Sequence, residues 1–599
     1  MIFTGRQQGE NGEHRATSAV PLQRPRQRER ALKRLEEGVT NVGLKTAAYR
    51  VISVLATASM AFALSGGAGL FAAQAAASPS GTIHYAENSS IPTLDPASWS
   101  GVTEQRPMSM IYDTLVEYNE TNTGLHPALA SSYTVSPDGL TYTFHLRPGV
   151  KFSNGDPVTA EDVIYSLNRI TSSDPLGAGA APYSGAYSDI VGYQQWMKSG
   201  QAATPGGPGL SGVTSPAPGV VQIKLAAPQP YFLNEMALTS AAVMDPKVVA
   251  QYGKNYELHA IGTGPYKLLS WNQGHQMILV ANPGSWRGTP SIAKIIIDEN
   301  VNSDLQLLRF EKGQYDMMNG PLPSEVYAKI ISDPSLRKLY HTAPMNGVLY
   351  FAFNFTKPPF NNLDMRLAVN YAVDKALLVR NITNGRAQIM SQPVPPGIAG
   401  YNPALQPYAY NPTLARKYLK LAHYSGQAIT LIYPSQTQDR IRMAEMIQQN
   451  LRSVGINVQI QGISQWTAFN DEEYNPKANW NIAWYDWWQD YPDAQDFLEN
   501  LLGTEMFNGT NVGNWTNPQF QKLVDTADTL PPTENGQRVK DYQQAEVIAH
   551  SQVPWLFVYT LWQDDLVQPW IKPQGTKNDL MLYLHPVLTT QFNHLTTTR

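Results

Sequence analysis

A strand–helix–strand pattern between residues 429 and 461 constrains the fold more than any other feature of this 599-residue sequence. Residues 429–433 form a short apolar run that is typical of a buried strand. Apolar side chains then recur on successive helical turns from Ile441 to Leu451, and Gly455 ends the helical pattern. Residues 456–461 alternate apolar and polar side chains, as a second strand does. Strands joined through a helix run parallel with a right-handed crossover, so the pattern predicts an α/β fold.

A second passage supports the same class. Residues 141–146 alternate polar and apolar side chains, which is typical of a half-buried strand. Thr159 then offers an N-cap hydroxyl to a helix whose apolar face carries Val163, Leu167 and Ile170. At this length the chain is expected to form about two to four domains.

Composition excludes several kinds of protein. The sequence has no cysteine, which excludes disulfides, thiolate metal sites, cysteine nucleophiles and lipid attachment through an N-terminal cysteine. The absence of cysteine is compatible with export, because a large core needs no disulfide. The formal net charge is −4, but residues 1–77 carry ten Lys/Arg and five Asp/Glu, so the remainder is acidic, at −9. An acidic body argues against a nucleic-acid scaffold.

The N-terminal 77 residues resemble an export signal. Residues 51–77 carry no charge, follow basic residues, and offer alanine-x-alanine cleavage sites at 73–75 and 75–77. An uncleaved membrane anchor is the alternative, although serine and glycines at 65–69 reduce the hydrophobicity. We therefore expect residues 1–77 to be a disordered basic N-terminus plus a signal peptide. We hypothesise that translation starts further downstream, because the arginine-rich stretch is long for a signal.

Several segments resemble one known family. The clearest is SPDGLTYTFHLRPGVKFSNGDPVTAEDVIYSLNR, residues 136–169. The others appear in the same order as in the family, and they are residues 93–96 (TLDP), 111–117 (IYDTLVE), 262–267 (GTGPYK), 364–374 (DMRLAVNYAVD) and 393–397 (PVPPG). From about residue 82 to its end, the chain resembles extracellular solute-binding protein family 5. That family includes the oligopeptide- and dipeptide-binding proteins of ABC importers.

The resemblance implies an α/β, two-lobed fold of the periplasmic-binding-protein type II, with an extra domain in the first lobe. The implied bounds are 78–110, 232–348 and 557–599 for domain I, 111–231 for domain II and 349–556 for domain III. Two hinge crossings are expected, near residues 349–355 and 555–561, which are apolar and extended.

The implied function is capture of a short peptide by hinge closure and its delivery to the permease of an ABC transporter. The protein would be an exported monomer, periplasmic or associated with the cell surface, without a cofactor or a cysteine-linked lipid.

The candidate ligand contacts lie mainly in residues 480–497, WNIAWYDWWQDYPDAQDF. In the peptide binders of the family, the aspartate of a W-x-x-D-Y pattern pairs with the peptide's α-ammonium group. Asp490 occupies that position, followed by Tyr491, and Trp487 is the preceding aromatic, expected either as a wall against the ligand or as packing between the lobes. From the residues alone, a turn residue that caps local backbone is the better explanation of Asp490, and the resemblance reverses that preference.

Two more tryptophans complete the predicted ligand-binding set. Trp484 occupies the position where oligopeptide-type members carry an arginine for the peptide's carboxylate, so this chain needs another carboxylate partner. Trp99 is the candidate from the first lobe. Asp486, Asp493 and Asp496 are expected to face solvent or cap backbone.

Other functions stay open at this stage. Six aromatic side chains between residues 480 and 491 would also suit stacking on sugar rings, and nickel-chelate, haem and opine binders share the fold. A hydrolase using carboxylates from residues 486–496 needs a second, separated carboxylate that the sequence does not mark. The G-x-S-x-G, H-E-x-x-H and P-loop motifs are missing, and the 11 histidines are scattered. We therefore expect no enzymatic activity and no metal site. A purely structural surface protein would leave the two-lobed signature unexplained.

Overall fold

A six-stranded sheet forms the centre of the computed structural model, which describes residues 79–118, 124–175, 180–573 and 592–599. Its strand order is β11–β16–β12–β15–β13–β14. The bounds are Met317–Asn319 for β11, Trp555–Val567 for β16, Tyr340–Phe353 for β12, Ile482–Trp488 for β15, Ile429–Pro434 for β13 and Val458–Ile463 for β14. The signal-peptide prediction falls outside the described residues.

The predicted strand–helix–strand unit is confirmed. Strands β13 and β14 pair in parallel, and the helix α13, Gln438–Ser453, connects them. Met443, Ala444, Ile447 and Leu451 form the buried face of α13, as the helical spacing indicates.

Two four-stranded sheets are built from strands that precede the central sheet in the chain. The first has the order β1–β10–β9–β8, with bounds Ser80–Ala86, Ile292–Asp298, Gln276–Ala281 and Tyr266–Asn272. The second has the order β4–β5–β7–β6, with bounds Ala130–Val135, Thr141–Leu146, Val220–Lys224 and Val213–Ala217. The short pairs are β2–β3, Val116–Tyr118 with Leu125–Pro127, and β17–β18, Ile571–Pro573 with Leu595–Thr597. The predicted strand at residues 141–146 is thus β5.

Helices surround these sheets. Their bounds are α2 Val102–Ile111, α3 Ala160–Ile170, α4 Tyr193–Ser199, α5 Phe232–Glu235, α6 Pro246–Tyr252, α7 Ser303–Glu311, α8 Ser324–Ser332, α9 Pro334–Arg337, α10 Leu363–Ala372, α11 Lys375–Ile382, α12 Pro412–Leu421, α14 Trp466–Glu473, α15 Gln495–Leu502, α16 Pro518–Asp528 and α17 Asn535–Gln552. In the part of the chain that the structure describes, none of the helices has the length and apolar character of a membrane span. Thr159 caps α3 in a capping box with Asp162, as its position predicts.

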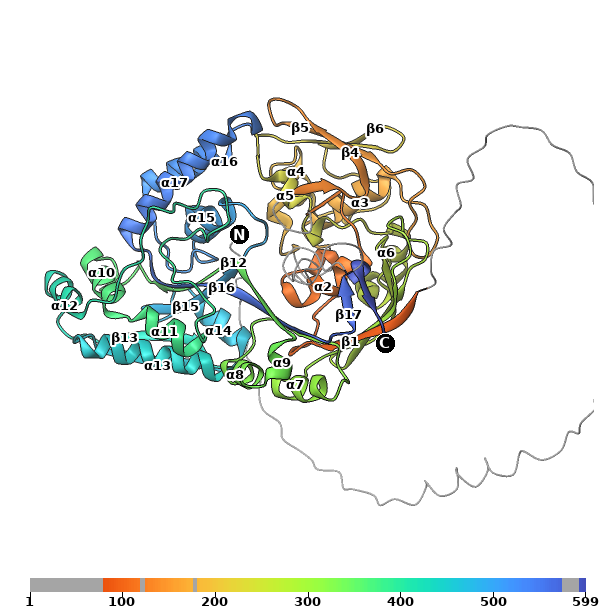
Figure 1. Cartoon of the computed structure of the whole chain (residues 1–599). Helices are drawn as coiled ribbons and strands as arrows, with labels where there is room; N and C mark the ends of the chain where they lie inside the picture. The colour runs from red at the N-terminus through yellow and green to blue at the C-terminus, as the bar shows by residue number, and fades with distance from the viewer. Residues whose placement is uncertain (1–78, 119–123, 176–179, 574–591) are drawn as a thin grey trace, which may run out of the picture. The chain divides into compact units, whose positions relative to one another are not determined.

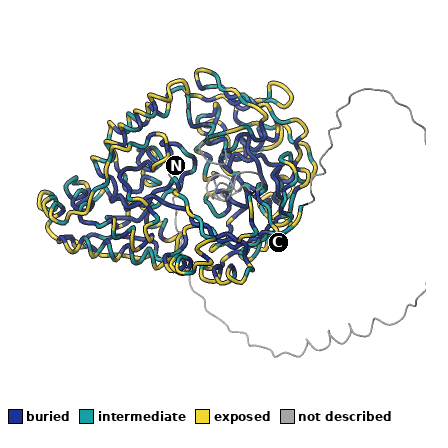
Figure 2. Tube along the Cα trace, viewed as in Figure 1, coloured by how far each residue is buried: buried dark blue, intermediate teal, exposed yellow. Residues whose placement is uncertain are grey.

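Strands β12 and β16 contain the predicted hinge crossings. They run side by side and antiparallel through the middle of the central sheet (Figure 1). Every residue of β16 is buried (Figure 2). The register shifts twice between them. Pro344 lies opposite Trp562 whereas Val348 lies opposite Thr560, and a second shift falls between Leu349 and Tyr350. The first shift, called the bulge of β12 below, gives β12 two more residues than β16 at the place where β12 meets the end of β15.

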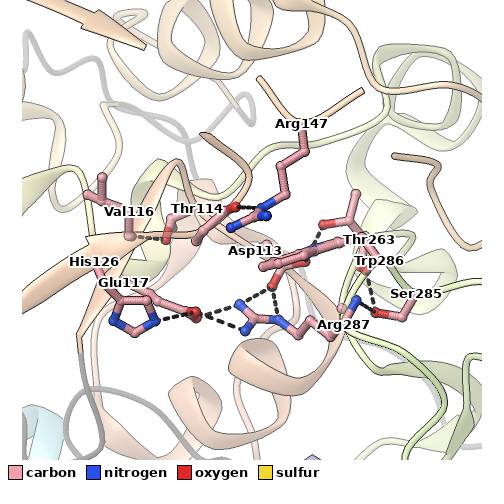
Figure 3. Close-up of polar contacts among 12 residues, drawn as sticks. Asp113, Thr114, Val116, Glu117, His126, Arg147, Thr263, Ser285, Trp286 and Arg287 are labelled. Atoms are coloured by element: carbon pink, nitrogen blue, oxygen red, sulfur yellow. Dashed lines mark hydrogen bonds and ion pairs between the residues drawn. The ribbon is translucent and has the colours of Figure 1, made fainter. Parts of the chain in front are cut away.

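A buried ion-pair network explains two of the family-like segments (Figure 3). Arg287 donates to Asp113 from Nε at 2.9 Å and from Nη2 at 2.7 Å, and from Nη1 to Glu117 at 2.9 Å. Thr263 donates to the other oxygen of Asp113 at 2.7 Å. Although burial alone would raise it, the charge of Arg287 and hydrogen bonds from His126 and Arg287 lower the pKa of Glu117 to about 2. The segment at 111–117 is therefore structural.

The segment at 262–267 is needed for close packing against α2. A Cβ atom at Gly262 would lie 2.1 Å from the carbonyl oxygen of Ile111, and one at Gly264 would lie 2.4 Å from that of Met110. Such distances exclude any side chain, so both positions require glycine.

Candidate functional site

A cavity of about 480 Å³ lies at the end of β15. Residues 78–348 and 557–599, the predicted domains I and II, are called the first lobe. Residues 349–556, the predicted domain III, are called the second lobe. Trp99, the start of α2 and Tyr183 line the cavity from the first lobe, and α14, β15 and Asp490 line it from the second. Three of the predicted ligand contacts, Trp99, Trp487 and Asp490, therefore meet at one cavity. Trp484 and Tyr491 are not among its lining residues.

The sheet fixes the position of Asp490. Strand β15 pairs antiparallel with β12, where Gly347 lies opposite Trp488. The next residue, Gln489, still donates its backbone N–H to the carbonyl of Asn346 at 3.0 Å, and Asp490 then leaves the sheet. The first four residues of β15 are buried and its last three are partly exposed, because the strand end borders the cavity.

The Asp490 side chain contacts the first lobe. Tyr183 donates its hydroxyl hydrogen bond to the Asp490 carboxylate at 2.9 Å. Burial raises the pKa of Asp490 to about 7, against the smaller opposing effect of this bond. The described residues form no salt bridge to Asp490. The result is a half-buried carboxylate without a cationic partner among the described residues.

Local backbone capping, the other role considered for Asp490, is performed by its neighbours. Asp496 accepts the backbone N–H of Asp490 at 2.9 Å, and Asp493 accepts that of Gln495 at 2.9 Å. Asp493 also makes a buried ion pair with Arg538, with N–O distances of 2.8 Å and 2.5 Å. The carboxylates of Asp493 and Asp496 thus already bind other groups of the protein.

Aromatic rings form the cavity wall contributed by the first lobe. The Trp99 and Tyr183 rings stack with centroids 4.3 Å apart and an interplanar angle of 21°. Trp99 is anchored by its indole N–H, which donates to the Gly101 carbonyl at 2.7 Å. Sequence reasoning missed Tyr183, which lies in the glycine-rich segment at 172–188 and carries no local signal of its role.

Trp484 and Tyr491 pack behind the cavity. Trp484 is 3% exposed and meets Trp466 edge to face, with ring centroids 6.1 Å apart. Tyr491 is 4% exposed and stacks parallel to Tyr231 of the first lobe at 6.1 Å. Their roles as ligand contacts remain predictions, and the geometry gives each a packing role.

A second cavity, of about 380 Å³, adjoins the first. The two share Val102, Thr103, Asp486 and Trp488 as lining residues. Asp486 was expected to face solvent or cap backbone, and that interpretation overlooked its position on both cavities. It accepts a hydrogen bond from the indole N–H of Trp488 at 3.3 Å.

The second cavity contains two guanidinium groups. Arg106 is ion-paired with Glu87 and donates to Asn319 at 2.7 Å. Arg440 lies 4.7 Å above the Trp484 ring and 5.5 Å above the Trp466 ring, and it donates to Gln436 at 2.9 Å. Burial lowers the pKa of Arg440, and no described carboxylate forms a salt bridge with it. Sequence reasoning missed Arg440, since nothing local to α13 indicates that it reaches β15.

Comparisons with known proteins agree with this architecture. The family model described as bacterial extracellular solute-binding proteins, family 5 middle, matches residues 124–509. "Heme-binding protein A" of Haemophilus influenzae is 28% identical over 472 residues, which are 76% of this chain and 82% of the relative. The "Dipeptide-binding protein" of Escherichia coli is 27% identical over 498 residues, 80% of this chain and 89% of the relative.

Solved structures confirm the predicted two-lobed type II binding-protein fold. The periplasmic binding protein DppA of Helicobacter pylori, in complex with the peptide STSA, superposes with a TM-score of 0.72 at 25% identity. The match covers 87% of this chain and 98% of that one. The chain belongs to family 5 of the bacterial extracellular solute-binding proteins.

Proposed function

We propose that this chain binds a short peptide in the two adjoining cavities and delivers it to the permease of an ABC importer. One observation carries the proposal, namely the half-buried Asp490 carboxylate, which faces a cavity lined by both lobes and lacks a cationic partner among the described residues. A dipeptide-binding relative and a neighbour solved with a bound peptide support the choice of ligand.

Asp490 is proposed to bind the peptide's α-ammonium group. An ionised carboxylate in a desolvated site attracts an ammonium group far more strongly than a solvated one does. The hydroxyl of Tyr183 occupies one oxygen of Asp490 and leaves the other for the ligand. Because Tyr183 belongs to the first lobe, a ligand at Asp490 would contact both lobes and favour their closed arrangement.

Arg440 is proposed to bind the peptide's carboxylate. Trp484 occupies the position where the resemblance leads one to expect an arginine, and the guanidinium of Arg440 lies directly over the Trp484 ring. A positive charge is therefore supplied at this place from α13. Guanidinium groups bind carboxylates with two parallel hydrogen bonds, which suits the end of a peptide.

The remaining parts of the proposal follow from the family. Members are substrate-binding proteins, and we propose that this chain likewise binds without making or breaking bonds in its ligand. It would act as a monomer in the periplasm or at the cell surface.

The test is a comparison of a free tripeptide with its N-acetylated form, measured by isothermal titration. Replacing Asp490 by Asn should weaken binding of the free tripeptide by about 2–5 kcal/mol, because the buried ammonium loses its partner. Acetylation removes the ammonium charge and should weaken binding to the unmodified protein, while Asp490→Asn should bind both forms equally.

Asp471→Asn, an exposed site on α14, is the matched control and should behave like the unmodified protein. Equal affinity of the unmodified protein for free and acetylated tripeptides would remove Asp490 from this role. Binding of oligosaccharides with no binding of peptides would overturn the proposed ligand class.

A further inference from the structure

Glu473, the last residue of α14, is a buried acid that forms no salt bridge with any described residue. Its side chain lines the first cavity, yet only 3% of the residue is exposed. Its Oε1 atom is buried and accepts no hydrogen bond from the described residues. A buried carboxyl oxygen without a partner is destabilising, so a hydrogen-bond donor that enters the cavity would stabilise this atom.

The position of Glu473 on its helix adds to the unfavourable electrostatics. The last turn of α14 contains Asp471, Glu472 and Glu473 and no basic residue. The C-terminal end of a helix carries a partial negative charge. Acids in the last turn are repelled by this charge, whereas a cation would be attracted to it.

A second acid lies next to Glu473 in the same cavity. Burial and then the charge of Asp486 raise the pKa of Glu473 well above its usual value. Burial likewise raises the pKa of Asp486, while the charge of Arg440 lowers it. The two acids thus interact repulsively, and the described residues form no salt bridge to either of them.

The surrounding groups suit an organic cation. The hydroxyls of Tyr474 and Tyr485 lie 3.2 Å apart beside the two acids, and they supply hydrogen-bonding oxygens. The rings of Trp466, Trp487 and Trp488 line the same cavity. Aromatic faces attract ammonium and guanidinium groups, and this attraction would add to the attraction of the cation by the two carboxylates.

We propose that Glu473 and Asp486 form a second cation site, and that the protein selects peptides with a basic side chain in addition to the α-ammonium group. The inference deepens the proposed function and rests on it. Asp490 would hold the α-ammonium, Arg440 the carboxylate, and the Glu473–Asp486 pair the ammonium or guanidinium of a lysine or arginine side chain. A neutral side chain at the same place would leave Glu473 Oε1 without a partner.

The test measures how strongly lysine is preferred over norleucine, which has nearly the same shape and no charge. Ala-Ala-Ala is compared with tripeptides that carry lysine or norleucine at each of the three positions, by isothermal titration with full-length protein freed of bound ligand. The preferred position should bind lysine about tenfold or more tighter than norleucine, as a hydrogen-bonded charge pair does.

Removing either acid should reduce this preference. In Glu473→Gln and in Asp486→Asn the lysine-to-norleucine affinity ratio should fall several-fold toward one. The control Asp471→Asn keeps an acid-to-amide change on the same helix but at an exposed position, and it should keep the full ratio. If Glu473→Gln does not fold, Asp486→Asn together with the unmodified protein decides the question.

The outcomes separate this inference from the proposed function. If lysine gives no advantage at any position while Asp490→Asn still abolishes binding, the second cation site is wrong and peptide capture stands. An unchanged lysine preference in both acid variants would also overturn the site. If no peptide binds, or if Asp490→Asn has no effect, the proposed function itself fails.

Discussion

At the scale of single residues, the aspartates between 486 and 496 differ in what they contact. Asp493 is neutralised by Arg538, and Asp496 accepts the backbone N–H of Asp490. Asp486 and Asp490 border the cavities instead. Four acids in one short stretch therefore divide into two that hold the protein together and two that are available to a ligand.

The raised pKa of Asp490 predicts how binding depends on pH. Burial raises the pKa of the Asp490 carboxyl to about 7 in this structure, so below that pH the group is neutral and attracts an ammonium group weakly. Affinity for Ala-Ala-Ala should therefore rise between about pH 6 and pH 8, and binding at the lower pH should release a proton. Above about pH 8 the peptide amine loses its own proton, and the affinity should fall again.

Calorimetry across this range, repeated in buffers of different ionisation enthalpy, measures both the affinity and the proton release. Asp490→Asn should flatten the acid side of the profile. A flat profile in the unmodified protein, or an acid side that persists in the variant, contradicts the assignment.

The sequence predicted part of this site. Trp99, Trp487 and Asp490 were found because they lie in or near family-like segments, and they do line one cavity. Tyr183, Arg440 and Glu473 were missed, since their proximity to β15 depends on tertiary packing of distant segments. The different contacts of Asp486, which lines the cavities, and Asp493, which pairs with Arg538, are likewise a property of the fold and leave no local pattern.

At the scale of elements, the end of β15 and the bulge of β12 are coupled by close packing. A Cβ atom on Gly347 would lie 2.9 Å from the carbonyl oxygen of Trp487 and 2.8 Å from a methyl group of Leu561. Only glycine lets β15 approach the two long strands this closely. The same contact holds Trp488 in place and, through Gln489, the start of the Asp490 turn.

Replacing Gly347 by Ala should therefore disturb both stability and binding. The added methyl group pushes against backbone, and we expect the free energy of unfolding to fall by about 1–3 kcal/mol, with weaker peptide binding because the strand end moves. Denaturant unfolding and titration calorimetry measure the two effects.

The matched control is Gly536→Ala at the start of α17, where a Cβ atom would meet open space. It should leave peptide binding unchanged. If Gly347→Ala matches this control in both measurements, the end of β15 does not depend on the bulge.

Element boundaries show where sequence patterns stop being informative. The expected crossing at 555–561 is the start of β16, yet the strand continues to Val567 through Gln563, Asp564 and Asp565. All three polar residues are fully buried, and tertiary contacts satisfy Asp564, whereas Oε1 of Gln563 and Oδ2 of Asp565 accept no hydrogen bond from the described residues. Asp564 accepts the backbone N–H of Leu322 at 3.0 Å and the indole N–H of Trp562 at 2.9 Å. Apolar runs therefore locate the strand but not its end.

At the scale of the whole molecule, contacts between the lobes converge on the residues proposed to bind the ligand. Tyr183 of the first lobe reaches Asp490, and Tyr231 stacks on Tyr491 next to it. Strands β12 and β16 carry the chain between the lobes beside the same site. A peptide held at Asp490 would thus add contacts to both sides of the hinge and stabilise the closed arrangement.

Small-angle scattering of the purified protein, with and without a saturating free-amine tripeptide, tests this account most directly. The account predicts that the tripeptide lowers the radius of gyration of the unmodified protein, and that neither the N-acetylated tripeptide nor the Asp490→Asn variant reproduces the decrease at the same concentration. Identical scattering with and without the tripeptide, under conditions where calorimetry shows it bound, would contradict closure over a ligand anchored at Asp490.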